Sequence, residues 1–159
     1  MTGSPEQIPG RAADTAGVGW NAEGVRVEDF RRELLAIVDE ALVAAERSPD
    51  IRDQEPFLVQ LVQLIREHPA HQALAEEELV ALSRRMASTP PPLGAVELLG
   101  YTVHEVELPG VIVALEGLRA IEGEHPIGRA WERARRVDRV LEARHRDWED
   151  RELFASLDL

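Results

Sequence analysis

The sequence lacks cysteine and lysine, and only 4% of its residues are aromatic. Without cysteine the chain has no disulfide, no thiolate metal ligand and no cysteine nucleophile. No uninterrupted apolar run is longer than five residues, Val111–Leu115 being one example, and such a run is too short to span a bilayer. The first residues also lack the basic and apolar regions of a secretory signal. We therefore expect a cytoplasmic protein that does not associate with membranes.

Acidic residues outnumber basic residues in the sequence. The 159 residues carry 30 acidic and 18 basic side chains, the basic ones all arginine, for a net charge of −12. A field of this sign repels phosphate, which argues against a nucleic-acid partner. Apolar residues make up 44% of the chain and charged residues 30%, which is typical of a globular domain rather than a disordered chain. The charge is compatible with a basic protein partner.

The N-terminal residues differ from the rest of the chain. Residues 1–24 contain five glycines and two prolines but no apolar period, which predicts a flexible tail. Trp20 is the large apolar side chain of this tail, and it would either dock on the fold, which we favour, or serve as a short binding determinant. Residues 25–159 are expected to form a single helical domain. Its first helix begins at Val27, because apolar residues then recur at helical spacing. These residues are Phe30, Leu34, Ile37, Val38, Ala41, Leu42 and Ala45.

Two further helices are predicted before the middle of the chain. The first of them begins near Asp53, a suitable N-cap, with Pro56 in its first turn. It is apolar on more than one side, which predicts a central position in the fold. The next runs from Gln72 to Ala87, with Glu76–Glu78 near its first turn, where the helix dipole favours acidic side chains.

A proline-rich linker divides the chain. Three consecutive prolines, Pro90–Pro92, favour a stiff extended connection between two halves, residues 25–88 and 93–159. Residues 93–122 then permit two interpretations. Apolar residues at helical spacing favour helices, whereas partial alternation within residues 101–115 would give one β-hairpin in an α+β fold. The apolar positions change face midway through the strand interpretation, so helices are favoured.

The C-terminal part is also predicted to be helical. One helix runs from Pro126 to about Arg146, and a short acidic helix follows from Trp148. The apolar side of this last helix would either dock on the core, which we favour, or bind a groove in another protein. Its apolar residues are Leu153, Phe154 and Leu157. The complete pattern predicts an all-α fold, a compact bundle of five or six helices.

The charges are segregated along the second half. Residues 97–128 carry six acids and one base, residues 129–146 carry seven arginines and three acids, and residues 147–159 carry five acids and one arginine. Arg129, Arg133 and Arg136 would share one helix face and could grip a carboxylate-rich or phosphorylated partner. The alternative is an internal mosaic, in which pairs such as Glu132 and Arg136 meet within the helix and the acidic flanks fold back.

A second group of polar residues would suit a ligand. If residues 93–122 are helical, Glu97, Tyr101 and His104 lie on one stripe and could form a small acid/base cluster. This cluster belongs to an alternative function, a small enzyme or ligand-binding domain with a pocket between the two halves. The simpler interpretation is a solvated helix face.

Metal binding rests on weaker patterns. His68 and His71 are three residues apart, but Pro69 interrupts the helix that would align them. Glu142 and His145 have the Glu-x-x-His spacing of di-iron bundles, a match that chance readily provides in an acidic chain. We therefore expect surface histidines and no metal or other cofactor, with a metal-binding helical bundle as the second alternative.

The sequence favours a function without catalysis. It contains no Gly-x-Ser-x-Gly nucleophile motif, no P-loop and no dinucleotide-binding motif placed between a strand and a helix. The leading hypothesis is an acidic protein-interaction module, such as a small cytosolic regulator, inhibitor or immunity-type protein, that binds a protein partner through complementary charge. A homo-oligomer is an open alternative, because the predicted second helix is apolar nearly all round.

Overall fold

The computed structural model describes residues 25–157, which form six α-helices and three short 3₁₀ turns without a β-strand. The helices are α1 (Val27–Arg47), α2 (Ile51–Glu67), α3 (Gln72–Met86), α4 (Ala95–Glu105), α5 (Pro109–Ile121) and α6 (Arg129–Glu142). The predicted all-α fold is confirmed. The alternative hairpin at residues 101–115 is wrong, because this segment is helical except at residues 106–108. The predicted tail, residues 1–24, and the expected docking of Trp20 lie outside the described residues.

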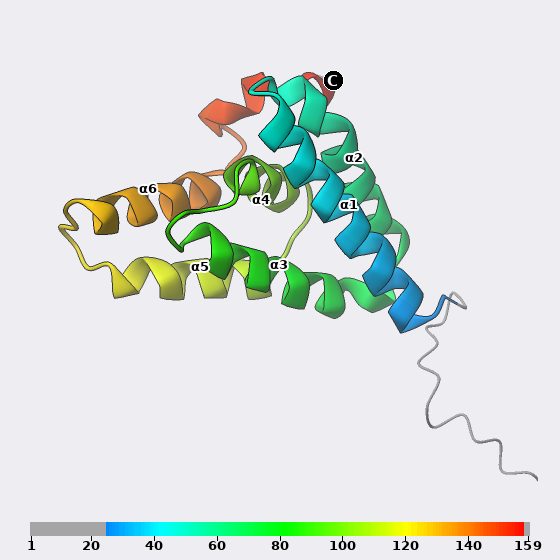
Figure 1. The fold of residues 1–159 in the computed structure, drawn as a ribbon. Coiled ribbons are helices and arrows are strands. Elements are labelled where there is room, and N and C mark those ends of the chain that lie inside the picture. Colours follow the sequence, from blue (N-terminus) through cyan, green and yellow to red (C-terminus); the bar gives the residue numbers. More distant parts are fainter. Residues whose placement is uncertain (1–24, 158–159) are drawn as a thin grey trace, which may run out of the picture.

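Helices α1 and α2 lie antiparallel on one side of the molecule (Figure 1). The predicted beginning of α1 at Val27 is confirmed, and the apolar face that was predicted is buried except for Ala45, which is partly exposed. The expected N-cap of α2 is wrong. Asp50 caps this helix instead, because its side chain accepts a hydrogen bond of 3.0 Å from the N–H of Arg52. Pro56 consequently lies in the second turn rather than in the first.

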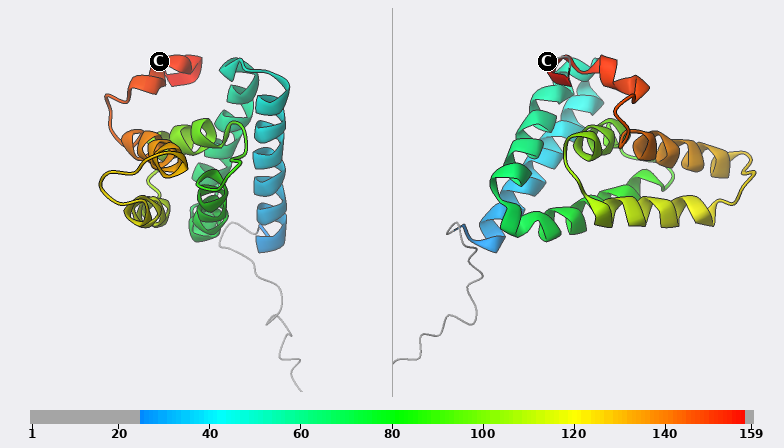
Figure 2. Two further views of the ribbon diagram at one scale, coloured as in Figure 1. Left: turned by 60° about the vertical axis from the view of Figure 1, so that its left-hand side comes forward. Right: turned by 180° about the vertical axis from the view of Figure 1, so that it is seen from behind.

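Helix α4, rather than α2, occupies the centre of the fold. It contacts α1, α2, α3 and α6, and residues Leu98–Val103 are all buried within it. Helix α3 packs along α5, and α5 in turn forms a hairpin with α6 that extends away from α1 and α2 (Figure 2). Because α3 precedes the proline-rich linker and α5 follows it, one core extends across both halves of the chain.

The helical interpretation of residues 93–122 is confirmed, with a break at residues 106–108. Pro109 cannot donate a backbone hydrogen bond to a preceding turn, so a new helix starts there. Glu76 of α3 accepts a hydrogen bond from the N–H of Gly110 and so satisfies a free donor at the beginning of α5. The prediction that Glu76 supports the beginning of its own helix is wrong, since it lies beyond the first turn of α3.

The C-terminal segment, residues 147–157, differs from its prediction. Helix α6 ends at Glu142, and two 3₁₀ turns, Glu149–Leu153 and Ala155–Leu157, replace the expected short helix. Phe154 between them has extended backbone angles, which turns its side chain inward while Leu153 points outward. The expected docking on the core is confirmed, because Trp148 and Phe154 are buried there.

Candidate functional site

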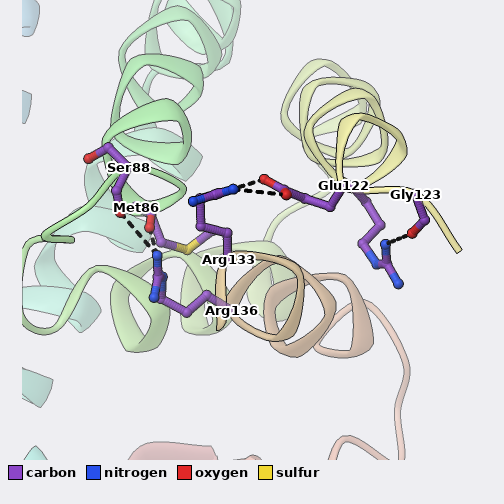
Figure 3. Close-up of polar contacts among 7 residues, drawn as sticks. Met86, Ser88, Glu122, Gly123, Arg133 and Arg136 are labelled. Atoms are coloured by element: carbon purple, nitrogen blue, oxygen red, sulfur yellow. Dashed lines mark hydrogen bonds and ion pairs between the residues drawn. The ribbon is translucent and has the colours of Figure 1, made fainter. Parts of the chain in front are cut away.

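The arginines of α6 make most of their contacts with other parts of the same chain. Arg133 donates two hydrogen bonds to the carboxylate of Glu122, at 2.7 Å and 3.1 Å (Figure 3). This paired contact holds the pKa of Glu122 below its usual range and raises the pKa of Arg133. Arg136 donates to the backbone oxygens of Met86 and Ser88, at 2.9 Å and 3.0 Å. Arg136 therefore satisfies carbonyl groups at the end of α3.

Of the three arginines predicted to face a partner, Arg129 is exposed and forms no ion pair within residues 25–157. The predicted pairs within the helix are absent from the described part of the chain. The ion pairs of this region instead join different elements, such as Arg139 with Asp150 at 3.1 Å and Arg144 with Glu116 at 3.2 Å. The internal mosaic exists, but tertiary packing rather than helical spacing selects its partners.

The predicted ligand cluster does not form one pocket. Glu97 borders a small depression beside the turn between α1 and α2. His104 borders a different groove at the break between α4 and α5, where its Nδ1 lies 2.8 Å from the backbone oxygen of Ala143. Tyr101 is 3% exposed and faces the core. These three residues therefore do not line a common pocket between the two halves, which the alternative function would require.

Tyr101 belongs to a buried polar cluster that sequence reasoning missed. Its hydroxyl lies 2.8 Å from Oγ of Ser156, which in turn donates a 2.6 Å hydrogen bond to Glu55. The N–H of Ser156 donates to the same carboxylate oxygen at 2.7 Å. Glu55 and Ser156 are 101 positions apart, so no local pattern could have joined them. The cluster fastens the C-terminal segment to α2 and α4.

Burial raises the pKa of Tyr101, because removal from water disfavours the phenolate. We expect the Tyr101 phenol of the native protein to ionise at a pH above the ordinary tyrosine pKa of about 10. The neutral phenol therefore contributes stability below that value, and this contribution is lost as the pH rises through the folded-state pKa. Since Tyr101 is the one tyrosine in the chain, absorbance at the tyrosinate band reports on it alone. Unfolding in guanidinium should return the midpoint to the ordinary value, and identical native and unfolded midpoints would contradict the burial.

Two of the histidines considered as weak metal ligands, His68 and His71, have structural roles. His68 and His71 pack against Phe30, with ring centres 5.5 Å and 4.9 Å away. The expectation that both lie on the surface is wrong for His71, which is 5% exposed and has Nε2 3.3 Å from the backbone oxygen of Val25. Glu142 and His145 are exposed near the end of α6. Among residues 25–157 no group of three or more potential ligands is arranged to hold a metal ion.

A second feature that sequence reasoning missed is acidic and lies between α1 and α2. It consists of two separate depressions, of about 220 Å³ and 380 Å³, which share no lining residue and follow one another along the seam of the two helices. Its floor is formed by Ile37, Ala44, Phe57 and Leu64, and its rim by Glu33, Asp39, Glu40 and Glu67 with Arg47. None of the four carboxylates forms an ion pair within the described residues. We call this feature the α1–α2 groove.

The signal for this groove was partly visible in the sequence. Glu33, Ile37 and Glu40 are spaced by four and three residues, so they lie along one line of α1. The pairing with α2 could not be inferred, because it depends on which face each helix turns toward its neighbour.

Comparison of the chain with protein-family models, with curated proteins and with solved structures finds no match. Within residues 25–157, no helix combines the length and the apolar character that crossing a membrane requires.

Proposed function

We propose that the chain is a non-catalytic, acidic protein-interaction module, a cytosolic regulator, inhibitor or immunity-type protein that binds a basic protein partner in the α1–α2 groove. The observation that supports this proposal is the set of four rim carboxylates without an intramolecular ion pair above an apolar floor. The arginines of α6, by contrast, are mostly engaged by the chain itself.

The two parts of the groove have different tasks. The partly exposed ring of Phe57 and the neighbouring aliphatic side chains offer apolar area, which supplies binding free energy when a partner covers it. Glu33 and Glu40 attract a basic surface, which raises the association rate and selects against acidic proteins. Such a contact weakens as salt screens the charges.

The experiment compares three forms of the full chain as bait in native lysate. The groove variant is Glu33→Lys with Glu40→Lys. The matched control is Glu149→Lys with Glu152→Lys, which changes the net charge equally at exposed positions outside the groove. We expect the unaltered chain and the control to retain a basic protein that elutes as salt rises, and the groove variant to lose it. Circular dichroism checks that all three baits are folded.

Equal recovery by the groove variant would contradict the proposal, as would the absence of any salt-sensitive partner. Recovery that falls equally in both variants would show a response to net charge alone, and it would also count against the groove.

A further inference from the structure

At the N-terminal end of α6, large apolar side chains and an arginine are exposed. Ile127 and Trp131 are 85% and 50% exposed, although both are large and apolar. Arg135 lies over the Trp131 ring, 5.5 Å from its centre, and forms no ion pair within residues 25–157. We call Ile127, Trp131 and Arg135 the α6 tip.

The α6 tip has the chemistry that the α1–α2 groove is suited to bind. An aromatic ring and an aliphatic side chain match the apolar floor, and the guanidinium group of Arg135 matches the carboxylates of the rim. Tryptophan and arginine are also the residues that most often dominate binding energy at interfaces.

The tip cannot reach the groove of its own chain. The α5–α6 hairpin extends away from α1 and α2, and its free end lies at the opposite side of the molecule (Figures 1 and 2). Any contact between the two surfaces therefore joins two copies.

We infer that the α6 tip of one copy docks in the α1–α2 groove of a second copy. The two surfaces are different, so each contact joins unlike faces of two copies. Repetition of the contact extends a chain, and reciprocal contacts between two copies or a ring close it. The net charge of −12 opposes close approach of two copies. At physiological ionic strength this repulsion is screened beyond about 8 Å, whereas the direct contact acts at shorter range.

Self-association would also regulate the groove. A copy whose groove is occupied by a tip cannot bind a basic partner there, so partner and second copy compete. This consequence rests on the proposed function, whereas the contact between copies does not.

Sedimentation velocity of the pure full-length chain at increasing concentration tests the inference. The average mass should rise above 17.7 kDa as the concentration increases. The tip variant is Ile127→Ser with Trp131→Ser, and the groove variant is Glu33→Lys with Glu40→Lys. Each variant alone should stay monomeric. An equal mixture should form a dimer that does not grow, because one intact tip meets one intact groove.

The matched control removes two other exposed apolar side chains, by Val113→Ser with Leu153→Ser. This control should associate like the unaltered chain. The inference is overturned by a monomer at every concentration, by association that survives both variants, or by loss of association in the control. Partner capture separates the two proposals, since the tip variant should lose self-association and still retain the basic partner.

Discussion

Exchange of Gly94 for alanine is expected to lower the free energy of unfolding by about 3 kcal/mol or more. Gly94 has a φ of +79°, a left-handed conformation that costs an L-residue roughly 1–2 kcal/mol. An added Cβ would lie 2.4 Å from Cβ of Ala45 and 2.5 Å from Nε2 of Gln54. Neither neighbour can yield cheaply, because Ala45 belongs to α1 and Gln54 is buried in α2. Overpacking of this kind adds about 1–3 kcal/mol.

Gly123→Ala provides the matched control. Gly123 has nearly the same backbone angle, a φ of +77°, but no atom lies within 4 Å of the position of an added Cβ. This variant should lose only the backbone contribution of roughly 1–2 kcal/mol. Denaturant unfolding followed by circular dichroism measures both variants. Similar losses at the two positions would show that the close approach of α4 to α1 and α2 is absent in solution.

The contact at Gly94 illustrates what a linear sequence withholds. The prolines before it predict a linker, and a linker does exist there. The sequence does not predict that the backbone oxygen of Gly94 accepts a 2.9 Å hydrogen bond from Gln54, 40 positions away. Such a contact depends on how finished helices pack, which hydrophobic spacing does not specify.

Local sequence patterns gave correct predictions where the interactions that determine the structure are also local. The beginning of α1 and its buried stripe follow from a repeat of three and four residues, and both were predicted correctly except for Ala45, which is partly exposed. The predicted end of α6 was wrong, and two 3₁₀ turns stand where a short C-terminal helix was predicted. Trp148 and Phe154 are drawn into the core there, and burial of two aromatic side chains overrides the helical preference of the segment.

In the candidate site, too, local features were predicted from the sequence and contacts between distant residues were not. Exposure of Arg129 agrees with its predicted place on an outward helix face. The engagement of Arg136 by Ser88, 48 positions away, depends on packing between α3 and α6. Arginine spacing alone therefore could not reveal that two members of the predicted patch are used to hold the fold together.

Phe154→Ala is expected to lower the free energy of unfolding by about 3–4 kcal/mol. The ring is 1% exposed, and its centre lies 5.0 Å from that of Tyr101 and 5.7 Å from that of Trp148. Its removal leaves a cavity between α4 and the C-terminal segment. It also loosens the neighbouring hydrogen bonds of Ser156 to Glu55.

Leu153→Ala is the control from the adjacent position, where the side chain is 50% exposed and the expected loss is below about 0.5 kcal/mol. The comparison distinguishes two roles that the sequence left open for this segment. A helix reserved for the groove of another protein would be detached in the free chain, and the two variants would then unfold alike. If the segment completes the core, the free energies of unfolding of the two variants must differ by several kcal/mol. Phe154 then stabilises every folded molecule, whether or not a partner is present.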